Sequence, residues 1–458
     1  MEFGFYHIAT ITVFVLAYLG IVFEHPLKLD KTVPALLAAA LTWALLSFGF
    51  HTGAVEIING HGEVFNFLKE APEIGNKGFE GTLLHHLGKT AEILFFLIGA
   101  MTIVELIDLH QGFEVLKGWI KTNKKQRLLW IIGGLAFILS AIIDNLTATI
   151  VLITLLRKVL HSRKERLWFA SLVVIAANAG GAWSPIGDVT TTMLWIGHKT
   201  TAFKLIEHIL LPAIVCFLVP TFVISRLSIM KGDIKLDVRE NVKKERLLSS
   251  RPMLFLGLGA IIFVPIFKTI THLPPYLGMV LGLSVVWMVS EYIHPEEQFK
   301  EERRHLYSAH TALSRIEMSS ILFFLGILLA VGALEAIVIG NVGALQAAAE
   351  WIDGRIPNQY IVVTLLGFLS AVIDNVPLVA AAMGMYDFPM DHPLWHYIAY
   401  SAGTGGSMLI VGSAAGVAAM GMEKIDFIWY FKKVSWLAFL GFIGGALTFM
   451  IMVKTGML

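Results

Sequence analysis

The sequence predicts an all-α polytopic membrane protein, built as an inverted repeat with two re-entrant hairpins and two discontinuous helices. Three observations lead to this prediction. Of the 458 residues, 56% are hydrophobic and only 15% are charged, whereas soluble domains carry about 25% charged residues. Apolar segments long enough to cross a bilayer recur along the whole chain. The phrase Ser-Ala-Ile/Val-Ile-Asp-Asn occurs at 140–145 and again at 370–375.

The basic residues set the predicted topology. Apolar segments occur at 5–23, 33–50, 90–110, 128–156, 168–198, 205–226, 252–268, 275–293, 318–340, 360–385, 396–422 and 434–453. Six of the connecting loops hold 27 of the 35 Lys and Arg residues. These loops are 24–32, 111–127, 157–167, 226–251, 294–317 and 423–433. The positive-inside rule therefore places them in the cytoplasm. The expected partner is the lipid bilayer, and no nucleic-acid partner is expected.

Two apolar segments do not fit a simple crossing. Segment 128–156 has basic loops on both sides and is long for one helix but short for two, so we expect a hairpin that returns to the cytoplasmic side. Its tip falls near 144–147. Segment 360–385 has almost no flanking basic charge, so we expect its hairpin to enter from outside, with a tip near 374–377, where Pro377 favours a break. The count becomes ten crossings and two hairpins, with both termini outside.

A glycine-rich interruption follows each hairpin. The first covers 178–188 and contains Gly-Gly and Ser-Pro; the second covers 403–413 and contains Gly-Thr-Gly-Gly-Ser. Both stretches are poor helix formers, so we expect discontinuous helices whose breaks face inward. Two such units in opposite orientation form an inverted repeat, which is typical of secondary transporters.

The predicted domain organisation follows from these repeats. The regions are N-terminal spans and an external loop at 1–89, a first inverted repeat at 90–226 with hairpin 128–156, a cytoplasmic linker at 227–251, scaffold spans and a cytoplasmic loop at 252–317, and a second inverted repeat at 318–458 with hairpin 360–385.

Asp144 and Asp374 are the first candidates for a functional site, because an ionisable group inside an apolar span is costly and is usually functional. Further ion-binding or proton-coupling candidates are Ser140, Asn145, Thr147, Asn178, Asp188, Thr190, Ser370 and Asn375, and a second tier comprises Glu92, Glu105, Asp108, Ser184, Thr191, Glu335, Ser407 and Ser413. Carboxylate, carbonyl and hydroxyl oxygens suit hard cations. We therefore predict Na⁺ at Asp144, Asp374 and Asp188.

Plainer roles exist for the same residues. An aspartate at a hairpin tip can cap a helix, and Ser and Thr often pack at interfaces between membrane helices. No cationic side chain lies in either hairpin or either break. An anionic substrate would therefore lack an obvious partner, which favours Na⁺, Li⁺ or H⁺ as cargo.

The two Asp-Asn phrases and the break Gly-Gly-Ala-Trp-Ser-Pro-Ile-Gly-Asp-Val-Thr-Thr at 180–191 resemble the NhaD-type sodium/proton antiporters, within the ion transporter superfamily. The resemblance covers nearly the whole chain. It implies a homodimer in a bacterial inner membrane, with a scaffold domain and a transport domain that moves as an elevator. It also implies exchange of cytoplasmic Na⁺ or Li⁺ for external protons, without a cofactor. Dicarboxylate members carry Ser-Asn-Thr at the hairpin tips instead.

Two other functions compete with this one. A transporter of the same fold could carry a carboxylate or arsenite anion. Alternatively, two buried aspartates could activate water, as in an intramembrane aspartyl protease. Both aspartates, however, lie in repeated Asp-Asn phrases, and no Gly-x-Gly-Asp phrase precedes either of them. We therefore expect a membrane antiporter and not an enzyme.

Overall fold

The computed structural model describes residues 4–60, 62–69, 71–118, 122–234, 247–295 and 306–458. The chain forms two compact units, each made of several separate stretches of sequence. The first unit comprises 1–94, 317–362 and 376–389, and the second comprises 95–316, 363–375 and 390–458. Three of the five unit boundaries fall inside helices, namely α4 (Pro72–Leu109), α16 (Gln359–Leu369) and α17 (Asn375–Met385). The division into repeats remains a prediction.

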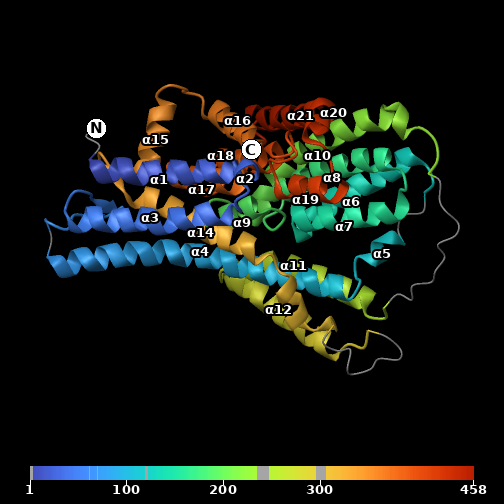
Figure 1. The fold of residues 1–458 in the computed structure, drawn as a ribbon, viewed down its shortest axis with the longest axis horizontal. Helices are drawn as coiled ribbons and strands as arrows, with labels where there is room; N and C mark the ends of the chain where they lie inside the picture. The colour runs from blue at the N-terminus through green and yellow to red at the C-terminus, as the bar shows by residue number, and fades with distance from the viewer. Residues whose placement is uncertain (1–3, 61, 70, 119–121, 235–246, 296–305) are drawn as a thin grey trace. The chain divides into compact units, whose positions relative to one another are not determined.

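The first unit is built on paired apolar helices (Figure 1). Its elements are α1 (Phe5–Val22), α2 (Glu24–Leu27), α3 (Thr32–His51), β1 (Ile57–Ile58), β2 (Val64–Phe65), α14 (Met318–Ala336), β3 (Val338–Ile339), β4 (Val342–Gly343) and α15 (Ala344–Asp353), with parts of α4 (Pro72–Leu109), α16 (Gln359–Leu369) and α17 (Asn375–Met385). Helix α3 packs closely on α14, because Gly326 lies against the backbone of Ala35. The Trp43 indole donates to the Leu329 carbonyl at 2.8 Å.

Two short antiparallel ribbons join the loops of this unit. Strand β1 pairs with β2, with Ile57 opposite Phe65, and β3 pairs with β4, with Val338 opposite Gly343. A bridge between Ile57 and Ile337 connects the two ribbons.

Helix α4 is longer than the apolar pattern predicts. It begins at Pro72, whereas the apolar segment begins at 90. The intervening residues, among them Gly75, Gly78 and Gly81, belong to the predicted external loop. In the structure Gly78 lies against the Phe65 ring. The close packing of this loop residue on the helix compensates for the low helix propensity of glycine.

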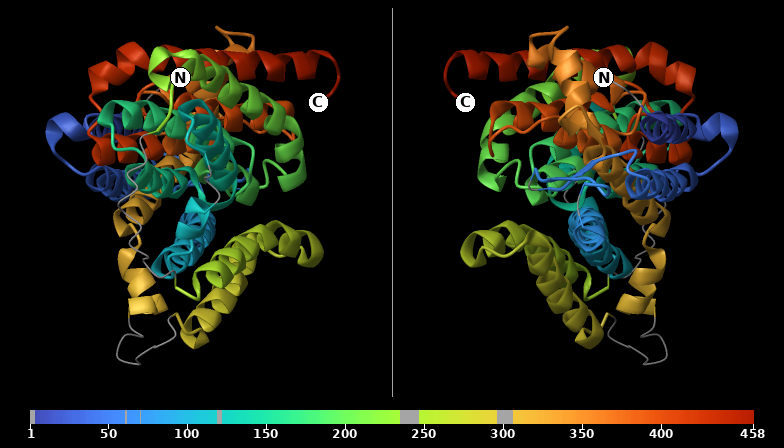
Figure 2. Two further views of the ribbon diagram at one scale, coloured as in Figure 1. Left: turned by 90° about the vertical axis from the view of Figure 1, so that its right-hand side faces the viewer. Right: turned by 90° about the vertical axis from the view of Figure 1, so that its left-hand side faces the viewer.

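The second unit holds both interrupted helices and the first hairpin. Its elements are the end of α4, α5 (Glu114–Lys117), α6 (Lys125–Ile143), α7 (Asn145–Val159), α8 (Arg163–Ala182), α9 (Val189–Ile196), α10 (Ala202–Arg226), the 3₁₀ helix η1 (Ser228–Met230), α11 (Ser250–Thr271), α12 (Pro275–Tyr292), α13 (Ala309–Arg315), the end of α16, the first residue of α17, α18 (Pro393–Gly405), α19 (Ala414–Glu423), α20 (Phe427–Lys433) and α21 (Ser435–Lys454). Helices α6, α7 and α8 lie side by side, and so do α11 and α12 (Figure 2).

The helices of the two predicted hairpins are interrupted close to the predicted tips, with small shifts. Helix α6 ends at Ile143 and α7 starts at Asn145, so the first hairpin turns at Asp144. In the second hairpin the helix is interrupted at 370–374, between α16 and α17. Pro377 is not the break itself. It lies in the first turn of α17, where its missing N–H removes no intrahelical hydrogen bond.

The two breaks are built by the same close approach of backbones. Helix α8 ends at Ala182 and α9 starts at Val189, while α18 ends at Gly405 and α19 starts at Ala414. In the first break Gly187 lies against the Ser140 carbonyl, and in the second Gly412 lies against the Ala371 carbonyl. A Cβ atom at either glycine would clash with the hairpin backbone. Glycine is therefore required where each break meets its hairpin.

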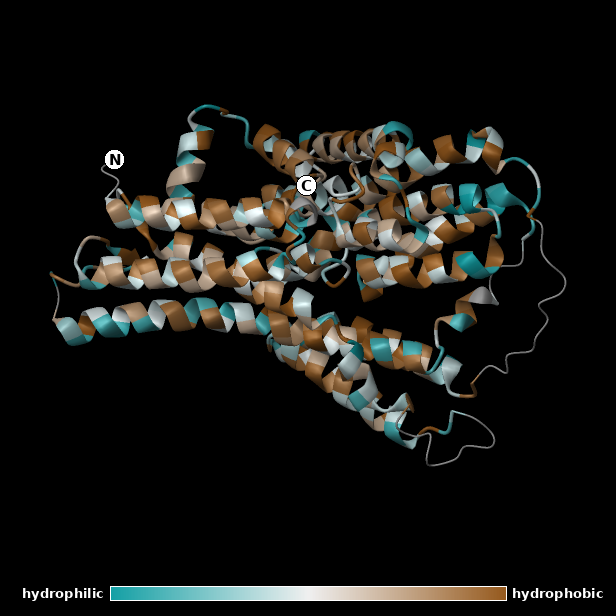
Figure 3. Cartoon of the chain, viewed as in Figure 1, coloured by the Kyte–Doolittle hydropathy of each residue, from teal (hydrophilic) through white to brown (hydrophobic). Residues whose placement is uncertain are grey.

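Within the described residues, eight helices are long and apolar enough to cross a membrane, which makes the chain a multi-pass membrane protein. They are α1, α3, α4, α6, α10, α11, α14 and α21. Hydrophobic residues run along these helices (Figure 3). Helix α6 is also one leg of the predicted first hairpin. Re-entry of the two hairpins and the total of ten crossings remain predictions.

We predict that Gly412→Ala lowers the free energy of unfolding by about 1–3 kcal/mol, because an added methyl group overpacks the contact with the Ala371 backbone. Cys216, the chain's one cysteine, is buried, so a thiol-reactive dye reports unfolding of the detergent-solubilised protein. Gly134→Ala is the matched control, since no atom lies within 4 Å of the added Cβ. Equal melting temperatures for the two variants would contradict the predicted contact.

Candidate functional site

A buried carboxylate, that of Asp188, lies at the centre of the candidate site. Asp188 is only 2% exposed and caps the N-terminus of α9. Its Oδ1 accepts hydrogen bonds from the Thr190 backbone N–H at 2.8 Å and from the Thr190 hydroxyl at 2.7 Å. The extended backbone of Asp188, with φ −149° and ψ 147°, turns the side chain toward these donors. Helix capping is thus a real role of Asp188, but it uses only part of the carboxylate.

Two asparagines, one from each repeated phrase, donate to this one carboxylate. Asn145 Nδ2 donates to Asp188 Oδ2 at 2.6 Å. Asn375 Nδ2 lies 3.3 Å from each of the two oxygens. All three side chains are buried. A buried charge is stable only when it is well paired or hydrogen-bonded. The two hairpin tips therefore meet at Asp188.

Asn178 connects this cluster to the second break. Its Oδ1 accepts from Asn145 Nδ2 at 3.1 Å. Its own Nδ2 donates to the Ser407 hydroxyl at 2.9 Å and to the Ser413 hydroxyl at 2.8 Å. Ser413 caps α19, where its Oγ accepts from the Gly416 N–H at 3.1 Å. One amide side chain thus bridges residues 229 and 235 positions away along the chain.

Asp144 lies at the tip of the first hairpin with an unfavourable backbone. Its carboxylate accepts from the Thr147 N–H and from the Thr147 hydroxyl, both at 2.8 Å. Its φ of 78° and ψ of 159° belong to a region that residues other than glycine rarely adopt. Such strain, about 1–3 kcal/mol, is concentrated at functional sites. Asp188 interacts electrostatically with Asp144 and with Asp374.

Ser140 and Ser370 have matching structural contacts. The Ser140 hydroxyl donates to the Ala177 carbonyl at 2.6 Å, and the Ser370 hydroxyl donates to the Ala402 carbonyl at 2.7 Å. Each serine therefore ties a hairpin to the broken helix that follows it. As donors, both hydroxyls keep their oxygen lone pairs for another ligand.

The remaining candidates are spread more widely. Thr191 donates to the Asp188 carbonyl at 2.9 Å, and the Ser184 hydroxyl accepts from the Ile186 N–H at 3.4 Å, so both stabilise the first break. Glu92 and Glu105 lie on α4, while Asp108, near the end of α4, lies 3.8 Å from Arg315. Glu335 belongs to the first unit, on α14, where its carboxylate lies 3.6 Å from the His86 ring.

The site is negative and rich in neutral oxygens. Within the described part of the chain, no three His, Cys, Asp or Glu side chains come close enough together to hold a metal ion. The three aspartates thus do not form a cage of carboxylates. A cation at this site would be held by one carboxylate together with amide, hydroxyl and backbone oxygens, which are ligands for hard cations.

Two contacts of the site were missed from the sequence. Gly181, in the last turn of α8, and Gly406, the residue after α18, occupy equivalent places, where they lie against the carbonyls of Gly187 and Gly412. The Gly-Gly pair in each break was the available signal. The prediction that these pairs interrupt the helix is wrong in detail, because Gly180 and Gly181 lie within α8 and Gly405 is the last residue of α18. The second glycine of each pair allows the following break to pack closely against the helix end.

Comparison with known proteins places this architecture in a family. The family described as "Citrate transporter" matches residues 18–403. Sodium/proton antiporter 1 of Arabidopsis thaliana is 44% identical, over 96% of this chain and 71% of that protein. The Na(+)/H(+) antiporter NhaD of Alkalimonas amylolytica is 31% identical, over 94% of this chain and 88% of that protein.

A solved structure supports the fold. The YdaH transporter of Alcanivorax borkumensis has a TM-score of 0.61 and 14% identity, and the match covers 93% of this chain and 99% of that chain. This likeness supports the all-α polytopic fold. The family matches confirm the resemblance drawn from the motifs and exclude the protease alternative, because the relatives are transporters. The chain belongs to the family of NhaD-type and plant sodium/proton antiporters.

Proposed function

We propose that this protein exchanges cytoplasmic Na⁺ or Li⁺ for external H⁺ by competitive binding at its buried aspartates. The convergence of Asn145 and Asn375 on Asp188 is the observation that carries the proposal. It joins both halves of the repeat at one acidic group. Na⁺/H⁺ exchange is also what the names of the Arabidopsis and Alkalimonas relatives state for those proteins.

Sodium binding competes with the hydrogen bonds that the two Asp188 carboxylate oxygens already accept. Five contacts from neutral donors surround the two oxygens, supplied by Thr190, Asn145 and Asn375. A sodium ion needs the same lone pairs. We propose that the two amides rotate when Na⁺ binds, so that each presents its Oδ1 to the ion in place of its N–H groups. Amides suit this exchange because they carry both an acceptor and donors.

Protons enter through the same carboxylates. Asp144 and Asp374 both interact electrostatically with Asp188. Like charges in a buried site disfavour simultaneous ionisation, whereas a nearby cation favours it. Binding of Na⁺ therefore releases protons, and a high proton activity expels Na⁺. Exchange results if only occupied sites cross the membrane. These protons belong to the interacting group and not to one residue.

The larger mechanism remains part of the proposal. We propose that the part of the second unit that contains the site belongs to the transport domain and moves as an elevator against a scaffold that includes the spans within 252–317. A homodimer in a bacterial inner membrane completes the proposal, although the relatives include plant as well as bacterial proteins. The mass of the detergent-solubilised protein tests the dimer, and a monomer would exclude it.

The name of the matched family favours one alternative, transport of a carboxylate such as citrate. The described hydrogen bonds of the site come from amides, hydroxyls and backbone N–H groups. A carboxylate would need a cation or several free donors here. We expect proton movement in everted vesicles to respond to Na⁺ and Li⁺. A response to citrate, succinate or arsenite alone would favour the alternative.

We predict that Asp188→Asn abolishes Na⁺-driven proton movement in everted vesicles, because the amide cannot release a proton or neutralise Na⁺. Asp144→Asn and Asp374→Asn should each do the same. Glu80→Gln, on the exposed surface of α4, is the charge-matched control and should retain activity. Full activity in the Asp188 variant would refute the central role assigned to this residue.

A second prediction tests whether the Asn145 and Asn375 amides bind Na⁺ directly or only compete with Na⁺ for Asp188. If the Asn145 and Asn375 oxygens bind the ion, Asn145→Ala and Asn375→Ala should each raise the KM for Na⁺ about tenfold, since about 1.4 kcal/mol corresponds to a factor of ten. If their N–H groups only occupy Asp188, the KM should fall instead. Dequenching assays over a series of Na⁺ concentrations measure the difference. A fall in KM would contradict amide rotation.

A further inference from the structure

Helix α20 has the composition of a segment at a membrane surface. It lies between α19 and the apolar span α21. Phe427, Ile428 and Phe431 are exposed, and the rings of Phe427 and Phe431, one helical turn apart, stack with centroids 6.4 Å apart. Trp436 follows and is also exposed. Phe and Trp side chains are typical of the apolar face of a helix that lies in the membrane interface.

Basic residues accompany this apolar face. Lys432 and Lys433 form the exposed last turn of α20, and Lys424 lies just before it. Long basic side chains can bury their stems against apolar surface while the charged ends remain in water. The positive-inside rule places loop 423–433 on the cytoplasmic side, where the leaflet carries anionic lipids.

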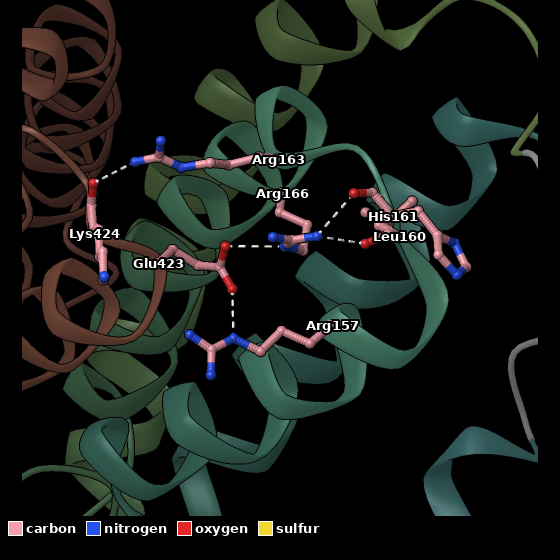
Figure 4. A network of polar contacts seen from close by, with 7 residues as sticks. All are labelled: Arg157, Leu160, His161, Arg163, Arg166, Glu423 and Lys424. Carbon is pink, nitrogen blue, oxygen red and sulfur yellow. Dashed lines mark hydrogen bonds and ion pairs between the residues drawn. The ribbon is translucent and has the colours of Figure 1, made fainter.

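The nearest buried acid does not cancel this charge, because it is already paired twice (Figure 4). Glu423 accepts from Arg157 Nε at 2.7 Å and from Arg166 Nε at 3.0 Å. Arg163 donates to the Lys424 carbonyl at 3.1 Å. Arginine charge thus exceeds carboxylate charge around the turn between α19 and α20. The other acid here, Asp426, caps α20 through the Trp429 N–H.

A hydrogen-bonded path leads from α20 to the ion site. Tyr430 is fully buried, and its hydroxyl donates to the Ser407 carbonyl at 2.9 Å. The Ser407 hydroxyl accepts from Asn178, which in turn accepts from Asn145. Trp429 packs edge-on against Trp168 of α8, with ring centroids 5.5 Å apart. A displacement of α20 would therefore reach the break that supports Asn178.

We propose that α20 and Lys424 bind anionic phospholipid of the cytoplasmic leaflet, and that this contact, through Tyr430 and Ser407, increases the affinity of the site for Na⁺. A lipid fits better than a free anion, because it supplies acyl chains for the apolar face as well as a charged headgroup for the lysines. The effect on Na⁺ affinity rests on the proposed function. The binding of lipid to α20 does not.

The first test is antiport by the full chain reconstituted in phosphatidylcholine vesicles with increasing phosphatidylglycerol. The KM for Na⁺ should fall severalfold as phosphatidylglycerol increases. The double variant Lys432→Gln/Lys433→Gln should lose this response. The control Lys124→Gln/Lys231→Gln, which removes two exposed basic residues from other predicted cytoplasmic loops, should keep it. The proposal is overturned if the wild type ignores phosphatidylglycerol, if both double variants respond alike, or if inorganic phosphate in phosphatidylcholine vesicles reproduces the effect.

The second test separates lipid binding from transport. A photoactivatable phosphatidylglycerol should cross-link to residues 424–436 in the wild type and in Asp188→Asn, but weakly in the Lys432→Gln/Lys433→Gln variant. Tyr430→Phe should keep the cross-link and lose the KM response, because it removes only the hydroxyl that reaches Ser407. Cross-linking elsewhere on the chain refutes the lipid surface. An unchanged KM response in Tyr430→Phe refutes the path through Tyr430 and Ser407. Transport by Asp188→Asn would instead show that the ion site is assigned wrongly.

Discussion

The hydrogen bonding of the Asp188 carboxylate is the constraint on which the rest of the second unit depends. A buried carboxylate is costly unless its oxygens are satisfied. Two of its donors, Asn145 and Asn375, come from hairpin tips 230 residues apart in the chain. Both hairpins must therefore reach the same point for either to be stable. This mutual requirement explains why the asparagine occurs in both copies of the phrase, since in each copy the asparagine contacts Asp188.

Close backbone packing allows the two hairpin tips to reach Asp188. Gly187 and Gly412 bring each break against the backbone of its hairpin, and Ser140 and Ser370 fix the same pairs by hydrogen bonds. These contacts are nearly identical in the two halves, but the caps that follow differ. Asp188 and Ser413 have almost the same φ and ψ, yet one is an acid and the other a hydroxyl. The two breaks thus have matching backbone contacts, but only the first break contributes a carboxylate, that of Asp188.

The sequence predicts the positions of the helices and breaks better than the contacts around Asp188. The apolar runs, the basic loops and the Gly-Gly pairs locate α6 to α9 and the breaks within a few residues, because these features depend on local composition. The contacts of Asp188 depend on which side chains meet after folding, and local composition does not contain that information. Asp188 was ranked below Asp144 for this reason. The extent of α4 was missed for a related reason, because Gly78 is stabilised in the helix by Phe65, a distant partner.

The hairpin tips of this chain differ from those of the dicarboxylate members in the acid and not in the asparagine. Dicarboxylate members, as the resemblance describes them, carry Ser-Asn-Thr where this chain has Asp-Asn, so the asparagine is common and the acid is not. In this structure the common residue makes the contact between the halves, and the acid at 144 occupies a strained backbone beside it. Strain persists only when the surroundings fix the conformation. Replacing that acid by serine would leave the amide contact intact and remove a negative charge near Asp188. We propose that cargo depends on the charge beside the meeting point and not on the amide contacts that build it, so that the same framework can serve a different cargo.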